Sequence, residues 1–165
     1  MTIKLKIMRE AAVFWKEAYP KLGYLFYATA FADNSIENSE MEMLKKAVKS
    51  RWLHIEDRQD EFGSDAAFQI ITVFDWLAAE QTSSEKAYKV FAAFCCKNHE
   101  WMSAAFKANI LQTAVDISLA FNGESKEEHI LLPNLAALSQ KTTKCAHCSL
   151  EEKQSTGPGA VSLSV

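Results

Sequence analysis

Hydrophobic positions recur at helical spacing along most of the chain. Apolar residues are three to four positions apart between residues 8 and 18, and Pro20 then interrupts the pattern. Because proline lacks a backbone donor and its ring clashes with the preceding turn, we expect a first helix that ends near Tyr19. Residues 21–32 carry one charge and apolar residues on every side, which predicts a buried central helix. Gly23 within it indicates close packing against a neighbouring helix.

Further helices are predicted along the rest of the chain. Residues 33–38 form a polar turn, and Ser39 followed by Glu42 is a capping box that opens a helix to about Trp52. An acidic loop over residues 56–65 leads into the next helix, and Ser83 or Ser84 caps another. The core faces of these two helices are Ala67, Ile70, Ile71, Phe74 and Leu77, and then Ala87, Val90, Phe91, Phe94 and Cys95.

The last two predicted helices bring the total to about seven. One covers residues 103–121 and stops at Asn122-Gly123, and a Ser125/Glu128 capping box opens a final helix toward residue 139, kinked at Pro133. Alternating runs of β-branched residues are absent, so we expect no strand of standard length. The fold class is therefore all-α, with one compact domain over residues 1–140 and a Ser-, Thr- and Gly-rich tail over residues 141–165 that we expect to be mobile.

Composition and charge exclude several classes of partner. The chain has 165 residues and a formal net charge of -3, and its basic residues are scattered, which argues against nucleic acid as a partner. No uncharged apolar run approaches about 18 residues, so no membrane insertion is expected and the cytoplasm is the expected location. The four cysteines lack the spacing of a secreted disulfide framework, so we expect no structural disulfide. Oligomeric state is left open.

The pattern of helix, polar turn, capping box and helix occurs twice. The turn that begins at Asp33 is matched by one that begins at Asn122, so that Glu40 corresponds to Glu128. The chain therefore divides into two diverged helix-turn-helix modules around the central helix. Each module places a carboxylate beside a helix N-terminus, where it either caps the helix or binds a metal or anionic group.

The first turn resembles a motif of the TerB-like family, known from tellurite resistance. Ala30-Phe31-Ala32-Asp33-Asn34-Ser35-Ile36 followed by Glu40 is similar to the family turn Ala-Asp-Gly-x-Ile-x-x-x-Glu. The resemblance covers about residues 20–140 and implies an all-helical cytosolic module in tolerance of tellurite and other chemical stress.

The resemblance to the TerB-like family also implies a divalent metal at Asp33, Glu40 and Glu128, or a protein partner at the same acidic turns. Asn34 stands at the glycine position, and asparagine tolerates a left-handed backbone. Asn122 stands where a second aspartate is usual, which removes one charge, and a cation such as Ca²⁺ would need carbonyls or water to complete its shell.

Two other functions are compatible with the acidic turns. In a non-catalytic protein-interaction scaffold without metal, the carboxylates of the acidic turns would only cap the helices. In a metal-dependent hydrolase, the same carboxylates would hold a catalytic metal. An EF-hand is excluded, because Asn38 and Leu44 occupy the glycine and glutamate positions of its loop. Zinc would require Cys145 and Cys148 to meet Cys95 and His99.

No nucleophile motif or phosphate-binding glycine loop is present in the sequence, so we assign no catalytic residue and expect no enzyme. Four tryptophans lie at different places in the helical pattern, and an exposed one would indicate a partner groove.

Overall fold

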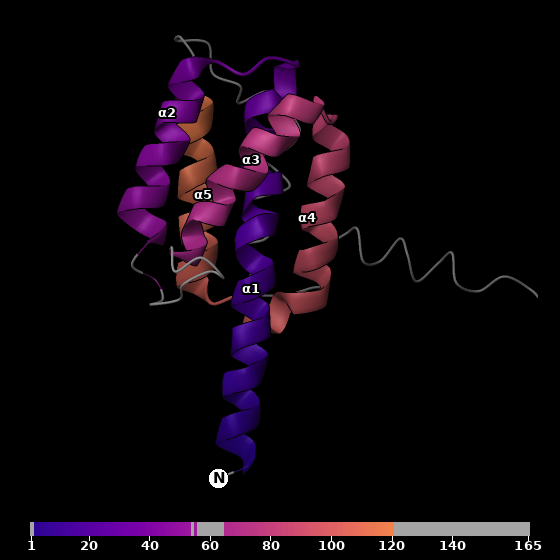
Figure 1. Ribbon diagram of the computed structural model, residues 1–165, viewed down its shortest axis with the longest axis vertical. Helices are drawn as coiled ribbons and strands as arrows, with labels where there is room; N and C mark the ends of the chain where they lie inside the picture. The colour runs from indigo at the N-terminus through magenta and orange to yellow at the C-terminus, as the bar shows by residue number, and fades with distance from the viewer. Residues whose placement is uncertain (1, 54, 56–64, 121–165) are drawn as a thin grey trace, which may run out of the picture.

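The computed structural model describes residues 2–53, 55 and 65–120, and every regular element in this part of the chain is helical (Figure 1). The five α-helices are α1 (Thr2–Ala30), α2 (Asn38–Ala47), α3 (Gln69–Glu80), α4 (Ser84–Asn98) and α5 (Ala104–Leu119). Short turns connect or extend them: η1 (Phe31–Asp33), η2 (Val48–Trp52), η3 (Ala66–Phe68) and η4 (His99–Trp101). The all-α class is therefore confirmed.

Helix α1 is the centre of the bundle and contacts α3, α4 and α5. Its residues from Leu22 to Ala30 are almost all buried, as expected for a central helix. The expected end at Tyr19 is wrong, because α1 continues through Pro20 without interruption. The reason is packing. Phe14 and Ala18 before the proline lie on the same buried face as Leu22 after it, and this continuous burial outweighs a loss of about 3 kcal/mol from proline in a helix.

Gly23 lies where α1 and α3 approach most closely. A Cβ atom added at this position would be 2.8 Å from the carbonyl oxygen of Ile70 and 2.8 Å from the Cβ of Val73. Both distances are shorter than ordinary van der Waals contact. The expected close packing at Gly23 is confirmed, and the neighbour is α3.

Helix α2 begins with a capping box that differs from the expected one. Its N-cap is Glu37 rather than Ser39, and the third helical residue is Glu40 rather than Glu42. The chain turns earlier than the sequence pattern suggests, because η1 ends in a left-handed residue at Asn34 and the helix can then start at Asn38. The expected end near Trp52 is correct, and the last turn, η2, has π-helical geometry.

The remaining helices follow their predicted boundaries closely. Asp65, Ser83 and Ser103 each accept a hydrogen bond from a backbone N–H in the first turn of η3, α4 and α5, respectively. The predicted core faces of α3 and α4 are largely confirmed, because Ala67, Ile70, Phe74, Leu77, Ala87, Phe91, Phe94 and Cys95 are buried. Ile71 and Val90 are only partly covered.

Helices α1 and α5 run parallel. Phe14 packs against Phe106 near the start of α5, with ring centroids 5.6 Å apart. Twelve residues further along α1, Phe26 packs against Trp52, whose indole N–H bonds to Thr113 in the second half of α5. The C-terminal ends of α1 and α5 therefore lie at the same end of the bundle (Figure 1).

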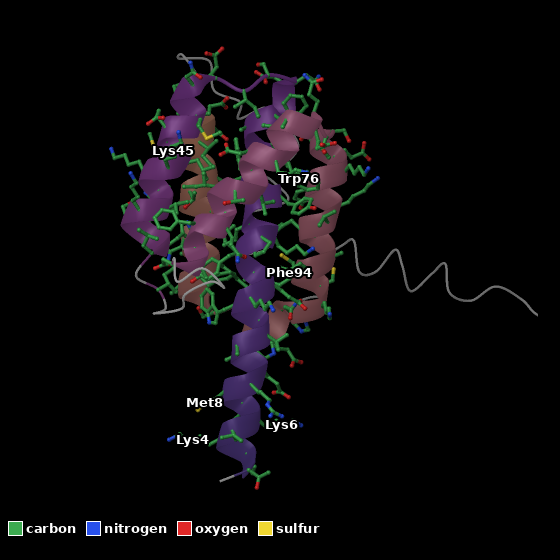
Figure 2. The ribbon with its side chains drawn as sticks, in the orientation of Figure 1. Lys4, Lys6, Met8, Lys45, Trp76 and Phe94 are labelled. Atoms are coloured by element: carbon green, nitrogen blue, oxygen red, sulfur yellow. The ribbon has the colours of Figure 1, made fainter. Side chains whose placement is uncertain are left out.

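The start of α1 extends beyond the other helices. Residues 2–10 are all exposed, and Figure 1 shows this segment below the rest of the bundle. We call residues 2–10 the N-terminal projection. Figure 2 shows Lys4 and Met8 on one side of it and Lys6 on the other.

The second predicted turn and the elements after it lie outside the described residues. This applies to the stop at Asn122-Gly123, the Ser125/Glu128 capping box, the kink at Pro133 and the tail from residue 141. Most of the acidic loop, residues 56–64, also lies outside them.

Candidate functional site

The first acidic turn connects α1 to α2 and contains Asp33. The Oδ1 atom of Asp33 accepts hydrogen bonds from the backbone N–H of Ser35 at 3.0 Å and from its hydroxyl at 2.9 Å. Between them, Asn34 has φ 65° and ψ 20°, which is the left-handed region that glycine, and next asparagine, adopts most readily. Asp33 therefore shapes the turn through its own side chain.

Glu40 lies at the other end of the same turn and is fully buried. Its Oε2 atom accepts a hydrogen bond from the backbone N–H of Glu37 at 2.9 Å, and the Glu37 side chain accepts one from the Glu40 backbone. The carboxylate also lies in the first turn of α2, where the helix dipole favours negative charge. Glu40 is thus the residue that fixes where α2 begins.

The structure brings Asp33 and Glu40 to one turn, but it does not assemble the predicted metal site. The third candidate ligand, Glu128, lies outside the described residues. Among residues 2–53, 55 and 65–120, no three His, Cys, Asp or Glu side chains gather closely enough to hold a metal ion. What the turn can do on its own is position the start of α2.

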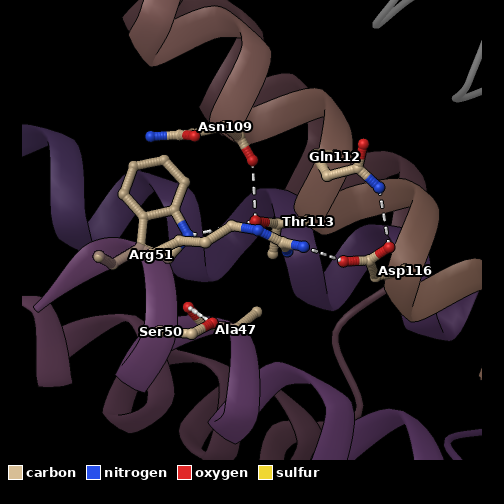
Figure 3. Close-up of polar contacts among 8 residues, drawn as sticks. Ala47, Ser50, Arg51, Asn109, Gln112, Thr113 and Asp116 are labelled. Atoms are coloured by element: carbon tan, nitrogen blue, oxygen red, sulfur yellow. Dashed lines mark hydrogen bonds and ion pairs between the residues drawn. The ribbon is translucent and has the colours of Figure 1, made fainter.

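A polar network joins η2 to α5 (Figure 3). Arg51 forms an ion pair with Asp116, which also accepts a hydrogen bond from Gln112 at 2.9 Å. Thr113 accepts the Trp52 indole N–H at 3.2 Å and donates its hydroxyl to the Asn109 carbonyl at 2.8 Å.

Sequence reasoning missed this network, because α5 carries polar residues at several positions and nothing in their spacing sets Thr113 and Asp116 apart. Its groups are engaged with one another, so its role is to hold η2 against α5.

Exposed aromatic side chains gather along α3. Trp76 of α3 is 52% exposed, and Phe68, the last residue of η3 directly before α3, is 38% exposed. The Trp76 ring meets Tyr24 of α1 edge-on, with centroids 6.3 Å apart and planes at 73°. The ammonium of Lys21 lies 5.4 Å from the centre of the Tyr24 ring. We call Tyr24, Phe68 and Trp76 the aromatic face.

The other tryptophans have different surroundings. Trp52 is fully buried, Trp15 is packed against Phe106 and Tyr19, and Trp101 stacks on Phe14 at the end of the bundle. Of the four, Trp76 is the one with the largest exposed fraction, so the aromatic face matches the expectation of a partner groove best.

Cys95 and Cys96, the two cysteines within the described residues, have different environments. Cys95 is buried in the core, and burial raises the pKa of its thiol to about 12, so it is not a nucleophile at neutral pH. Cys96, its half-exposed neighbour, is disulfide-bonded, which contradicts the expectation of no disulfide. That expectation came from the usual redox state of the cytosol, whereas a half-exposed side chain on α4 is accessible to a second thiol.

The proposed zinc set is not assembled by the described residues. His99 is exposed, and its Nδ1 atom lies 3.4 Å from the Cys96 carbonyl oxygen. Cys145 and Cys148 lie outside the described residues. Cys95 faces the core rather than the solvent, which argues against its role as a ligand beside His99.

A shallow depression lies over α2 and η2 and is lined by Glu42, Lys45, Lys46, Lys49 and Ser50. Lys45 is paired with Glu42 at 3.2 Å on the helix surface. The lysines are surface side chains on one helical segment, and none is buried. The depression is therefore a solvated charged face.

Comparisons of the chain with protein-family models, with curated proteins and with solved structures found no match. Within the described residues, no helix has the length and apolar character needed to cross a bilayer.

Proposed function

We propose that the chain is a non-catalytic, TerB-like helical module that acts by binding a protein partner. The observation that carries this proposal is the aromatic face. Trp76 is half exposed, yet its ring is oriented by Tyr24, which in turn is covered by Lys21. Tryptophan and tyrosine are enriched among the residues that dominate interface energies, and an oriented ring loses little conformational entropy on binding.

Two observations support the TerB-like layout of about seven helices in two modules. The first is the left-handed backbone of Asn34, at the position where the family motif has glycine. The second is the parallel course of α1 and α5, because two repeated modules in one bundle would start from helices of the same direction. A cytoplasmic role in tolerance of tellurite-type chemical stress is part of the proposal, and deletion of the chain would then lower growth on tellurite.

The partner can be sought from the centre of the aromatic face. A photo-reactive phenylalanine analogue at Thr72, which is exposed between Phe68 and Trp76, should cross-link to whatever covers this face. The captured protein is then purified and titrated against the full chain. Trp76→Ala should weaken its binding at least about tenfold, as for an interface residue that contributes strongly.

The matched control is Leu119→Ala, because Leu119 is 56% exposed but lies on α5. It should leave the affinity within about twofold of the wild type, as surface changes outside an interface do. Equal binding by the wild type and Trp76→Ala would contradict the proposal.

The second candidate function is the binding of a divalent cation at the acidic turn. It is favoured by the position of Asp33 and Glu40 at the two ends of one turn, with Glu128 as the third ligand in the TerB-like layout. The carboxylate oxygens suit a hard cation, and backbone carbonyls or water would complete its shell.

Calorimetry and thermal unfolding with Mg²⁺, Ca²⁺, Mn²⁺ and Zn²⁺ test this candidate. An ion at 100 times its dissociation constant would add about 2.7 kcal/mol to the free energy of unfolding. Asp33→Asn should abolish the effect, whereas Asp75→Asn, which alters an exposed acid on α3, should not. The same variants tested on phosphoester and ester substrates with Mg²⁺ or Mn²⁺ examine the metal-dependent hydrolase. No binding by any ion would exclude both metal functions.

A further inference from the structure

Cys96 and His99 lie close together where α4 ends. Cys96 is in the last turn of α4 and is partly exposed, and His99 is the exposed first residue of η4. The Nδ1 atom of His99 lies 3.4 Å from the Cys96 carbonyl oxygen, so the imidazole ring is turned back toward Cys96. Cys95 does not belong to this pair, because it is 3% exposed and packs in the core. The end of α4 therefore presents a Cys-x-x-His pair to the solvent.

The disulfide of Cys96 connects this pair to the second cysteine pair of the chain. The four cysteines are at positions 95, 96, 145 and 148, and Cys95 is free. Within one chain, the partner of Cys96 is therefore Cys145 or Cys148, which both lie outside the described residues. The Cα atoms of disulfide-bonded residues are about 4.4–6.8 Å apart. Three residues of extended chain span at most about 11 Å, so the cysteine that is not bonded to Cys96 is also near it.

We propose that the reduced chain binds one Zn²⁺ ion through Cys96, His99, Cys145 and Cys148. The sequence supplies these ligands as Cys-x-x-His at 96–99 and Cys-x-x-Cys at 145–148, and both pairs have the two-residue spacing common in zinc sites. Three cysteines and one histidine are a usual combination in structural zinc sites. The set differs from the one expected from the sequence, because Cys96 replaces the buried Cys95.

The His99 ring makes the kind of hydrogen bond that zinc-bound histidines make. A carbonyl oxygen only accepts hydrogen bonds, so the contact with the Cys96 carbonyl places the proton of the neutral ring on Nδ1. The Nε2 atom then keeps its lone pair for the metal. Metal-binding histidines usually donate their other ring N–H to a carboxylate or a backbone carbonyl, which fixes the tautomer and the ring orientation. His99 therefore binds the zinc ion through Nε2.

The chain is long enough to bring the two pairs together. Helix α5 ends at the same end of the bundle as α1, whereas Phe94 near the end of α4 stacks on Phe14 at the other end. Residues 121–144 must therefore cover the length of α4, which has 15 residues and is about 22 Å long. Even a fully helical segment of 24 residues spans about 36 Å, so the Cys-x-x-Cys pair reaches the end of α4.

Four protein ligands close the coordination sphere of the ion, so this site is structural rather than catalytic. It attaches the Cys-x-x-Cys pair to the end of α4. The site lies at the opposite end of the bundle from the acidic turn, because that turn follows the C-terminal end of α1. The inference rests neither on the aromatic face nor on a cation at the acidic turn.

The disulfide and the zinc complex use the same cysteines, so zinc binding requires reduction. A dithiol such as dithiothreitol transfers two electrons and two protons to the disulfide sulfurs and leaves as its own cyclic disulfide. Zn²⁺ then binds three thiolates, and three thiol protons are released, because the thiolate is the metal ligand. The oxidised chain has lost two of the three thiolates and should bind zinc far more weakly.

The test compares zinc binding by the full chain in its two redox states. The reduced chain is freed of dithiothreitol under anaerobic conditions and titrated with Zn²⁺ in competition with a chromophoric chelator. We expect one equivalent of tightly bound zinc in the reduced chain and none in the oxidised chain. Co²⁺ in place of Zn²⁺ should give the thiolate-to-metal charge-transfer absorption that identifies sulfur ligands.

Four variants test the ligand set. Cys96→Ser and His99→Ala should each weaken zinc binding at least about hundredfold, because loss of a residue that only supports a ligand already weakens it about 10–100-fold. The matched controls are Cys95→Ala, beside Cys96, and His147→Ala, between the other two cysteines, and both should bind zinc as the wild type does. Cys96 and His99 are at the surface, so the fold is retained, and circular dichroism checks it.

Peptide mapping tests the connection between the two pairs separately. Trypsin cleaves the unreduced Cys95→Ala chain after lysines, and mass spectrometry should find residues 90–97 linked to residues 145–153. Reduction should separate the two peptides. The alanine at position 95 ensures that the link is assigned to Cys96. Absence of this linked peptide would remove the observation that brings the two pairs together.

Three outcomes of the zinc titration would overturn the proposal. In the first, the reduced wild type binds no stoichiometric zinc. In the second, Cys96→Ser or His99→Ala binds zinc as tightly as the wild type. In the third, zinc binding is lost in Cys95→Ala or His147→Ala, which would place the ion on other residues. Asp33→Asn should bind zinc normally here, and loss of binding in this variant would assign the ion to the acidic turn instead.

Discussion

Replacement of Gly23 by alanine tests the packing of α1 against α3 most directly. In an exposed helix this change would stabilise the protein by about 1 kcal/mol, because alanine has the higher helix propensity. Here the new methyl group would lie 2.8 Å from the Ile70 carbonyl oxygen and from the Val73 Cβ. Ordinary contacts are about 3.5–4.0 Å, so the two helices must separate by about 1 Å.

Gly23→Ala is therefore expected to destabilise the protein, whereas the same change at an exposed helical site would stabilise it. Overpacking costs about 1–3 kcal/mol, and the upper part of that range applies because one obstacle is backbone that cannot change rotamer. After subtraction of the propensity gain, Gly23→Ala should lower the free energy of unfolding by about 2 kcal/mol. At about 2–4 °C per kcal/mol for a chain of this size, the midpoint of thermal unfolding falls by about 4–8 °C.

Calorimetry and urea unfolding measure the effect, and a second variant calibrates it. Ala93→Gly alters an exposed residue in the middle of α4 and should lower the free energy of unfolding by about 1 kcal/mol. This value measures the difference in helix propensity between alanine and glycine in this protein. Gly23→Ala should also change Trp76 fluorescence, since Tyr24, beside Gly23, supports the Trp76 ring. If Gly23→Ala were as stable as the wild type or more so, the reasoning on helix contact would be refuted.

Two further predictions concern buried groups. Glu40→Ala should lower the free energy of unfolding in urea by about 1–3 kcal/mol, because it leaves the Glu37 N–H without its acceptor. Glu42→Ala at an exposed position is the control and should change that free energy by less than about 0.5 kcal/mol. Equal effects of the two variants would contradict the observed cap. Burial raises the pKa of Cys95 from 9.0 to about 12, so this group's contribution to stability is complete below pH 9 and is lost as pH rises to 12. The loss is at most about 1.4 kcal/mol per pH unit, and Cys95→Ala should reduce this slope measurably in unfolding experiments between pH 8 and 11.

Much of the fold could be predicted from local patterns. The cap at Ser83 and the core faces of α3 and α4 follow from spacing and hydrogen-bonding chemistry that act within a few residues. The predicted helix end at Pro20 was wrong because the loss of stability caused by a proline is visible in the local sequence, whereas the burial that outweighs it comes from three other helices. The cap at Glu37 was missed for a similar reason, since only the tertiary fold buries Glu40.

The candidate surfaces were less accessible to sequence reasoning. Trp76 lies off the predicted core face of α3, which indicated from the sequence that it is exposed. Its contact with Tyr24 could not be predicted in this way, because the two residues are about fifty positions apart in the sequence and lie on different helices. The exposure of Ile3 and Ile7 could not be predicted, because their spacing is that of an ordinary buried stripe. What decides it is how far α4 and α5 extend, and that is a property of the assembled bundle.

The central position of α1 has a consequence for how the chain folds during synthesis. Helix α1 is synthesised before α3, α4 and α5, which pack against it, and the residues that bury it extend to Ile117 in α5. At a synthesis rate of about 5–20 residues per second, roughly 5–20 s pass between the synthesis of Leu22 and Phe26 and that of the residues of α5 that cover them. During that interval the core face of α1 is not yet covered by α3, α4 and α5, and a nascent-chain chaperone that binds exposed apolar helix faces would find a site there.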